Sequence, residues 1–239
     1  MEKNSVNKLK SELENLSASE GLLFISKLFG GQAKFSTSFG VEDQVITHLI
    51  ASQSLGIEIF TLDTGRLFQE TYDVFDLTKK RYKIPITTYF PDPKRVEKLV
   101  SEKGPNSFFE SVENRKECCF IRKVEPLQRA LKNTTVWITG LRSEQSENRN
   151  GLEIVEWNEQ YQLIKYNPIL NWSWDEVNRF VEQNKIPINT LHKKGFPSIG
   201  CAPCTRAIAA GENSRAGRWW WESSSKECGL HEHKAVVLN

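Results

Sequence analysis

The stretch Lys34-Phe35-Ser36-Thr37-Ser38-Phe39-Gly40-Val41-Glu42-Asp43 reads as a strand, a glycine turn and the first turn of a helix. Alternating apolar and small polar residues predict the strand over 34–39, and Gly40 ends it. The helix opens on two acidic residues and carries apolar residues at helical spacing from Val45 to Ile50. A strand that runs directly into a helix is typical of a βαβ unit, which indicates a parallel sheet.

The same alternation continues along the chain on both sides of this stretch. We predict strands over 57–62, 86–90 and 136–139, a strand pair within 152–166, and helices over 6–28, through 72–77, over 93–103 and over 173–184. The sequence therefore predicts an α/β fold, a mostly parallel twisted sheet with helices on both faces. We expect one domain over 1–210, followed by a mobile C-terminal tail over 211–239.

Three predicted strands end in small or charged residues. These ends are Ser38-Phe39-Gly40, Asp63-Thr64-Gly65-Arg66 and Gly140-Leu141-Arg142. In a parallel sheet, ligands bind beyond the carboxyl ends of the strands. Any one of these segments alone could be an ordinary turn, but the three together favour a ligand-binding rim.

Composition narrows the function classes. The 239 residues carry a formal net charge of +2, which argues against a dedicated nucleic-acid binder. No segment is apolar over a length that would span a bilayer, and the polar start Met1-Glu2-Lys3-Asn4-Ser5 lacks the apolar run of a signal peptide. We therefore expect a cytoplasmic protein that binds neither nucleic acid nor membrane, and whose local basic clusters suit a small anionic ligand.

Five cysteines form a group of four and a group of one. Cys118 and Cys119 are adjacent, Cys201 and Cys204 have Cys-x-x-Cys spacing, and Cys228 stands apart. Spaced cysteines in a cytoplasmic protein are more often metal-binding or catalytic than disulfide-bonded. Adjacent helical side chains diverge by about 100°, which suits the corners of an iron–sulfur cluster better than one zinc ion. We expect a [4Fe-4S] cluster, with zinc or unliganded core cysteines as the alternatives.

The C-terminal region carries two further candidates. Cys228 lies between Lys226 and His231, and nearby cations lower a thiol pKa and favour the nucleophilic thiolate. An inert surface thiol is the alternative. Arg215 and Arg218, three residues apart, could clamp phosphate or sulfate through their fork geometry.

Several motifs together point to one family. They are Ser38-Phe39-Gly40-Val41-Glu42-Asp43, Leu62-Asp63-Thr64-Gly65-Arg66, Cys118-Cys119-Phe120-Ile121-Arg122-Lys123, Gly140-Leu141-Arg142 with Gln145-Ser146 and Arg149, Ser198 to Ala207, Arg215 to Glu222, and Lys226 to His231. In this combination the chain resembles the assimilatory sulfonucleotide reductases, specifically the cluster-containing adenosine 5′-phosphosulfate (APS) reductases. Two residues depart from the family's pattern: Phe196, where many members carry Tyr, and Arg115, where some carry His.

The resemblance implies a fold, an activity and a set of site residues. The fold would be adenine nucleotide alpha-hydrolase-like. Cys228 would attack the sulfur of APS, AMP would leave, and thioredoxin or glutaredoxin would release sulfite from the S-sulfocysteine. Implied catalytic residues are Cys228, His231 and Lys123; implied substrate-binding residues are Ser36, Ser38, Gly40, Asp43, Leu62, Asp63, Thr64, Gly65, Arg66, Gly140, Arg142, Arg149, Arg215 and Arg218; implied cluster ligands are Cys118, Cys119, Cys201 and Cys204.

Alternatives remain at this stage. The 3′-phosphorylated substrate PAPS, or use of both substrates, is the nearest one, although PAPS-specific members generally lack the four cysteines. A zinc-stabilised nucleotide- or RNA-binding module comes from another class. An ATP-cleaving enzyme of the same sheet class would carry a fuller glycine loop than Thr37 and Phe39 allow. A homo-oligomer is compatible with the sequence, which does not decide the oligomeric state.

Overall fold

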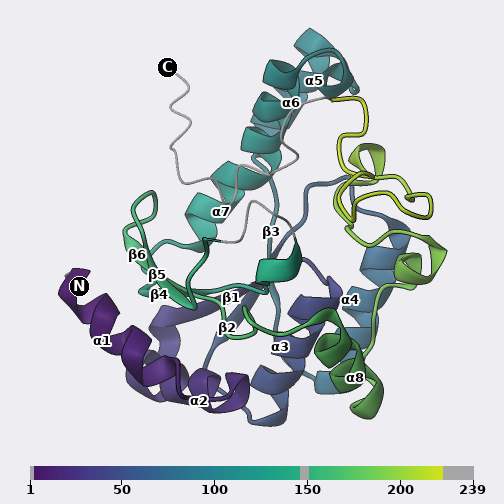
Figure 1. The fold of residues 1–239 in the computed structure, drawn as a ribbon. Coiled ribbons are helices and arrows are strands. Elements are labelled where there is room, and N and C mark those ends of the chain that lie inside the picture. The colour runs from purple at the N-terminus through teal and green to yellow at the C-terminus, as the bar shows by residue number, and fades with distance from the viewer. Residues whose placement is uncertain (1–2, 146–150, 223–239) are drawn as a thin grey trace.

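A six-stranded sheet of order β3-β2-β1-β4-β6-β5 forms the centre of the protein (Figure 1). The computed structural model describes residues 3–145 and 151–222. The strands are β1 Ala33–Thr37, β2 Glu58–Leu62, β3 Thr87–Tyr89, β4 Val136–Ile138, β5 Val155–Asn158 and β6 Leu163–Tyr166. All neighbouring pairs are parallel except β5 with β6. The predicted α/β class with a mostly parallel sheet is confirmed.

Helices precede the first strand, connect β1 to β4 and follow the last strand. They are α1 Lys3–Leu13, α2 Ala18–Phe29, α3 Val41–Ser52, α4 Gln69–Tyr82, α5 Pro93–Lys103, α6 Val112–Cys119, the π-helix η3 Phe120–Val124, α7 Glu125–Ala130 and α8 Trp174–Gln183. Short 3₁₀ turns are η1 Gly30–Gln32, η2 Ser107–Phe109, η4 Ser143–Gln145, η6 Thr190–Lys194 and η7 Ala202–Cys204. Among the described residues, no helix has both the length and the apolarity to cross a bilayer.

Alternation along the strands distributes side chains between two cores. Ile59 and Ile138 belong to the large core on one face, and their neighbours Phe60 and Trp137 belong to a smaller core on the other. Successive side chains of a strand point to opposite faces, so the buried strands are apolar on both. Helices cover both faces, as the sequence predicted, with α7 supplying Leu127 to the smaller core.

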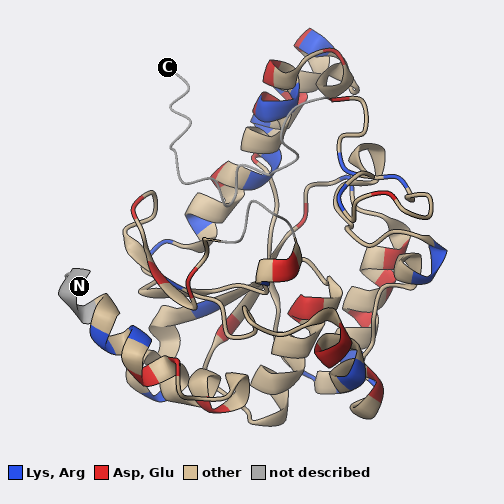
Figure 2. Cartoon of the chain, in the orientation of Figure 1, with Lys and Arg blue, Asp and Glu red and all other residues tan. Residues whose placement is uncertain are grey.

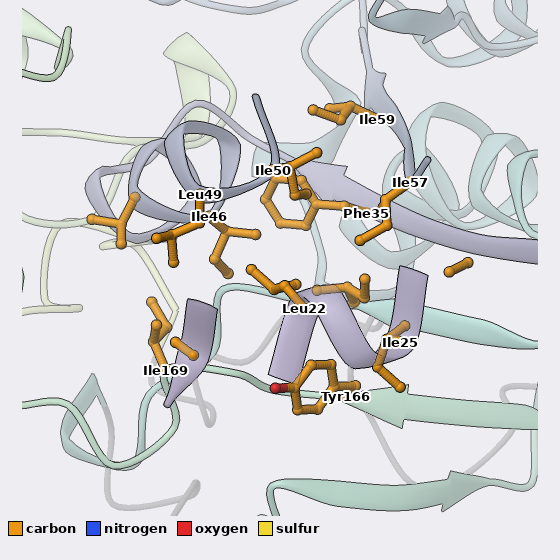
Figure 3. Close-up of a cluster of buried hydrophobic side chains, with 14 of the residues drawn as sticks. Leu22, Ile25, Phe35, Ile46, Leu49, Ile50, Ile57, Ile59, Tyr166 and Ile169 are labelled. Atoms are coloured by element: carbon orange, nitrogen blue, oxygen red, sulfur yellow. The ribbon is translucent and has the colours of Figure 1, made fainter. Parts of the chain in front are cut away.

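The large core lies between the sheet and helices α2 and α3 (Figure 3). Leu22 and Ile25 of α2 lie against Phe35 of β1 and Tyr166 of β6 in this view, and all four are nearly inaccessible to solvent. Burying an aliphatic side chain of this size stabilises the fold by roughly 1.5–3 kcal/mol. This core holds β1 and β4 at the centre of the sheet and so fixes where their carboxyl ends meet.

The predicted helix over 6–28 is two helices, which is a correction to the prediction. The chain leaves the helical conformation after Leu13, and Ser17 starts α2. Ser17 Oγ accepts from the Glu20 backbone N–H while the Glu20 carboxylate accepts from the Ser17 N–H. This capping box satisfies helix donors locally, so a new helix begins where the leucine spacing alone suggested continuity. The predicted caps Asp92 and Ser173 are confirmed.

Helices α6, η3 and α7 follow one another without a break and form a rod beside the sheet (Figure 1). Figure 2 shows basic and acidic residues interleaved along this part of the chain. The central five residues, Phe120–Val124, have the wider π-helical hydrogen-bond pattern, which is rare and frequently marks a functional site. The rod thereby carries the double cysteine and Lys123 past the sheet edge.

The first residues of the predicted tail pack against the domain. Trp219 is only 1% exposed and Arg218 pairs with Thr205 in an isolated β-bridge. The packed chain therefore extends through Glu222 at least, beyond the predicted boundary at 210. The remaining tail residues, with Cys228 and His231, lie outside the described residues.

Candidate functional site

A cavity of about 540 Å³ opens at the carboxyl ends of β1, β2 and β4. The chain leaves β1 toward β2 on one side, and β4 lies on the other side of β1, so the strand order reverses there. Ligands of open parallel sheets bind at such a switch point. The cavity is lined by eleven predicted site residues: Ser36, Ser38, Gly40, Asp43, Leu62, Thr64, Lys123, Gly140, Arg142, Arg215 and Arg218.

The loop after β1 is shaped by Phe39. Its φ is +61°, a left-handed conformation that non-glycine residues rarely adopt. The ring is buried and stacks on Phe75 at 4.6 Å, and this packing holds the strained turn in place. The turn brings Ser38 back over Asp43, whose Oδ2 accepts from the Ser38 N–H at 2.6 Å and from its hydroxyl at 2.7 Å.

The N-terminus of α3 points into this loop. Its N-cap is Gly40, which has no side chain to cap the helix, and Gly40, Glu42 and Asp43 line the cavity. The positive end of a helix dipole favours an anion at such a position. Gly140 after β4 closes the other wall, where a Cβ atom would come within 2.2 Å of Asp43 Oδ1.

Arg142 lies in the cavity wall but is engaged by other residues. Its Nε donates to Glu42 at 3.1 Å, and its Nη1 donates to Glu144 at 3.1 Å and to the Trp172 carbonyl. The guanidinium also lies 5.6 Å from the Trp174 ring centroid. In this structure the charge of Arg142 is therefore balanced by two glutamates, which the sequence analysis did not single out.

The four predicted ligand cysteines come together beside the nucleotide-sized cavity. Cys201 and Cys204 are buried in one cluster, and Cys118 and Cys119 pack against them. They surround a second, small cavity of about 20 Å³. Among residues 3–145 and 151–222, no set of three or more His, Cys, Asp or Glu side chains converges as the ligands of a single metal ion do.

Unsatisfied donors surround the thiols. Within the described part of the chain, Arg66 Nη1, Arg122 Nε, Trp219 Nε1 and Trp221 Nε1 are buried without a hydrogen-bond partner. Arg66 and Arg122 line the small cavity, and the two tryptophans belong to the cysteine cluster. Buried donors normally have partners. An anionic cluster held by four thiolates would accept hydrogen bonds from such donors, so these residues fit a four-thiolate cluster.

The surroundings shift the thiol pKa values in different directions. Burial raises the pKa of Cys118, and burial together with the neighbouring Cys201 raises that of Cys204 to about 12. Burial also acts to raise the pKa of Cys201, but the charge of Lys123, a hydrogen bond with Thr64 and the charges of Arg218 and Arg122 together lower that pKa. Ionising Cys118 and Cys204 therefore requires a bound cation or cluster to compensate for their burial.

Lys123 and Thr64 form the wall between the two cavities. Among the described lining residues, Lys123 is the one that borders both. Thr64 lines the large cavity and places its hydroxyl 3.3 Å from Cys201 Sγ. Its carbonyl accepts from Arg122 Nη1 at 2.7 Å, which ties the end of β2 to the π-helix. A change of charge at the four cysteines therefore acts electrostatically on residues that line the large cavity.

Three predicted substrate-binding residues lie elsewhere. The carboxylate of Asp63 accepts from the Tyr72 hydroxyl and from the Gly65 N–H, so it shapes the turn after β2. Its presence and burial raise the pKa of Tyr72 to about 12, with burial the larger cause. Gly65 supplies a φ of +70° in that turn, and Arg66 borders the cysteine cavity. Arg149, Cys228 and His231 lie outside the described residues.

Trp137 is the main site residue that the sequence analysis missed. Its indole N–H donates to Ser36 Oγ at 2.8 Å in the cavity floor. The sequence of β4 does indicate this position, because alternation along a strand places Trp137 on the opposite face of the sheet from Val136 and Ile138. His192 and Leu127 also line the cavity, and both lie just outside the predicted motifs, Leu127 after Lys123 and His192 before Ser198.

Comparison with known proteins agrees with this arrangement. The family described as "Phosphoadenosine phosphosulfate reductase domain" matches residues 32–207. Adenosine 5′-phosphosulfate reductase of Agrobacterium fabrum is 46% identical over 93% of this chain and 86% of its own length. The enzyme of the same name from Allochromatium vinosum is 49% identical over 84% of this chain and 78% of its own length.

Solved structures give the same result for the fold. The crystal structure of phosphoadenylyl-sulfate (PAPS) reductase from Candida auris, in a phosphate complex, superposes with a TM-score of 0.74 at 28% identity. That match covers 86% of this chain and 98% of the other. Yeast FAD synthetase in complex with FAD is similar in fold alone, with a TM-score of 0.56 at 15% identity over 87% of this chain and 70% of its own.

Proposed function

The chain belongs to the phosphoadenosine phosphosulfate reductase family, and from that premise we propose that it reduces adenosine 5′-phosphosulfate to sulfite and AMP. One observation carries the proposal: Lys123 borders both the 540 Å³ cavity and the cavity surrounded by four cysteines. The large cavity suits a nucleotide in volume, in its position at the sheet's switch point and in the helix N-terminus that borders it.

The first chemical step is attack by the thiolate of Cys228 on the sulfur of APS. An S–S bond forms, the bond from sulfur to the bridging phosphate oxygen breaks, and AMP leaves with the electron pair. The product is an S-sulfocysteine. Negative charge accumulates on both the attacked sulfate and the departing phosphate, so a thiolate needs cations around it. Lys123, Arg215 and Arg218 line the cavity and supply that charge.

The second step consumes a dithiol of the thioredoxin or glutaredoxin class. One partner thiolate attacks Sγ of the modified Cys228 and expels sulfite, leaving a mixed disulfide. The second partner thiol attacks that disulfide and restores the Cys228 thiolate. Both electrons come from the dithiol, which becomes oxidised. Reduced dithiols of this kind persist in the cytoplasm, where we place the reaction.

Cys118, Cys119, Cys201 and Cys204 would hold a [4Fe-4S] cluster. The four thiols, the buried donors around them and the nearby arginines fit such an anionic group. When bound, the cluster would supply negative charge and a structural tie between the rod and the loop of Cys201, rather than electrons. This chain's own contribution is to hold Lys123 at the boundary with the substrate cavity.

The proposal is tested by mixing the anaerobically purified protein with ³⁵S-labelled APS in the absence of reductant. We expect label on the chain, mapping to Cys228 and released as sulfite by reduced thioredoxin. Cys228→Ser should abolish labelling while the iron content stays unchanged. Cys201→Ser should lose iron, and full retention of iron would show that the ligand set is wrong.

PAPS is the second candidate substrate, favoured by the family description and by the Candida auris structure. Label transferred from PAPS but not from APS would keep the mechanism and change the substrate. Label from neither would reject the reductase proposal and leave a nucleotide-binding module as the alternative.

A further inference from the structure

Residues 217–222, here called the strap, are attached to the cysteine cluster along their length. The Gly217 carbonyl accepts from the Arg206 N–H at 3.0 Å, and the Trp219 N–H donates to the Cys204 carbonyl at 3.2 Å. Trp219 is buried in the same cluster as Cys201 and Cys204. A Cβ atom on Gly217 would meet the Arg206 carbonyl oxygen at 2.2 Å, so the strap approaches its neighbour as closely as backbone allows.

The far end of the strap is fixed by a buried ion pair. Arg115 Nε and Glu222 Oε1 lie 2.6 Å apart, and their side chains are 5% and 6% exposed. Arg115 belongs to α6, one turn before Cys119, and its guanidinium lies 4.6 Å from the Trp219 ring centroid. Burial acts to lower the pKa of Arg115, but the contacts with Glu222 and with Cys119 outweigh this and raise it, so the guanidinium stays charged.

This pair differs from an exposed ion pair that joins α6 to α5. Lys103 and Glu117 lie 2.7 Å apart, but their side chains are 41% and 37% exposed. Exposed pairs contribute little to stability, whereas removing one partner of a buried pair leaves an uncompensated charge. A buried pair at this position therefore holds residue 222 against α6 more firmly than packing alone would.

We propose that the Arg115–Glu222 pair is a latch that positions the chain for the first chemical step. The proposal rests on the proposed function and names two positioning residues for it. Glu222 is six residues before Cys228, so an extended connection reaches at most about 20 Å from the latch. Fixing residue 222 against Arg115 of α6 therefore limits the volume that the Cys228 thiol can reach, which raises its effective concentration at the substrate.

The latch acts on the end of the strap and not on the fold of the cysteine site. Trp221 and Trp220 pack on Phe109, with ring centroids 4.4 and 6.2 Å away, and neither Arg115 nor Glu222 takes part in these ring contacts. A neutral variant of Glu222 should therefore still hold iron and still bind nucleotide. The effect should be confined to the rate of sulfur transfer.

The experiment compares Glu222→Gln with Glu117→Gln, which makes the same charge change in the exposed pair between α5 and α6. Iron content, the Kd for AMP, hydrogen–deuterium exchange of residues 217–222 and the single-turnover rate of ³⁵S transfer from APS are measured for each. For Glu222→Gln we expect transfer at least tenfold slower and faster strap exchange, with iron and the AMP Kd within twofold of the parent protein. Glu117→Gln should match the parent protein in all four.

Three results would overturn the latch: unchanged transfer in Glu222→Gln, slow transfer without faster strap exchange, or loss of iron in proportion to loss of rate. The double variant Arg115→Gln/Glu222→Gln provides a further test. Because both charges are removed together, the double variant should transfer sulfur no more slowly than Glu222→Gln. A slower rate, equal to the losses of the two single variants added together, would show that Arg115 and Glu222 do not act as a pair. If the parent protein itself takes no label from APS, the proposed function fails and not the latch.

Discussion

Lys123 is held on a π-helix at the boundary between a cysteine cluster and a nucleotide-sized cavity. At this position its charge faces thiol sulfur on one side and the substrate space on the other. The charge of Lys123 lowers the pKa of Cys201, so the lysine and this thiol interact electrostatically. From this one position, the Lys123 ammonium group can therefore interact electrostatically with both cavities.

We expect Lys123→Ala to lower turnover about 100-fold, the magnitude associated with losing one group that stabilises developing charge. The melting temperature should change little, because Lys123 is only half-buried. Steady-state kinetics and thermal unfolding check this, with exposed Lys116 on the same rod as the matched control in Lys116→Ala. A rate equal to that of Lys116→Ala would remove Lys123 from the site.

Trp137 acts through the Ser36 hydroxyl, which accepts its indole N–H. Trp137→Phe keeps an aromatic ring against Tyr161 but leaves Ser36 without this donor. We expect AMP to bind about fivefold more weakly, because one neutral hydrogen bond contributes about 1 kcal/mol. Calorimetric titration with AMP checks this, and Trp157→Phe at the sheet edge should bind AMP as the parent protein does.

At the scale of elements, the site depends on how closely α3 approaches the loop after β4. The approach is set at Gly140, where no room exists for a Cβ atom beside Asp43. Asp43 in turn holds the Ser38 backbone and hydroxyl. One contact between two elements therefore shapes the loop that surrounds the helix N-terminus.

We expect Gly140→Ala to push Asp43 away, destabilise the protein by about 1–3 kcal/mol and weaken AMP binding at least tenfold. Denaturant unfolding and AMP titration measure the two effects. Gly31→Ala is the control, because nothing lies within 4 Å of its added Cβ atom. Normal AMP affinity in Gly140→Ala would show that the loop tolerates the displacement of Asp43.

At the scale of the whole molecule, both described histidines favour their neutral form. Burial lowers the pKa of His48, with the nearby Arg81 adding to it, and burial lowers that of His192. The unfolded chain titrates these groups near their ordinary pKa of about 6.5, so it takes up protons before the folded protein does. Their stabilisation is therefore complete above pH 6.5 and is lost as pH falls toward the lower folded values.

We expect the melting temperature to fall between pH 7.5 and pH 5.5, and to fall less in His192→Gln. The lowered carboxylate pKa values of Glu20, Glu70 and Glu176 contribute only near and below their ordinary value of 4.5, outside this window. Thermal unfolding at constant ionic strength checks the slope. A variant with the slope of the parent protein would mean that His192 is not buried neutral.

Much of the fold follows from local patterns. The helix at 93–103 and the capping box at Ser173 form where the pattern placed them, because caps and spacing are set by neighbouring residues. The strand predicted over 34–39 is shorter, Ala33–Thr37, because Phe39 adopts a left-handed turn conformation with a φ of +61°. The break between α1 and α2 was missed because leucine spacing continues across it, while the capping box at Ser17 decides it. The pairing of the four cysteines in one cluster also followed from their number and spacing.

The sequence by itself determined the α/β class, the small and charged strand ends that meet at one cavity, and the grouping of the four cysteines, since each depends on residue type at short spacing. Only the tertiary structure decided that Glu42 and Glu144 engage Arg142, that Trp137 holds Ser36, and that Arg115 pairs with Glu222. These pairs join residues up to 107 positions apart. Such contacts depend on how the sheet, the rod and the strap pack in three dimensions, and no local periodicity encodes that packing.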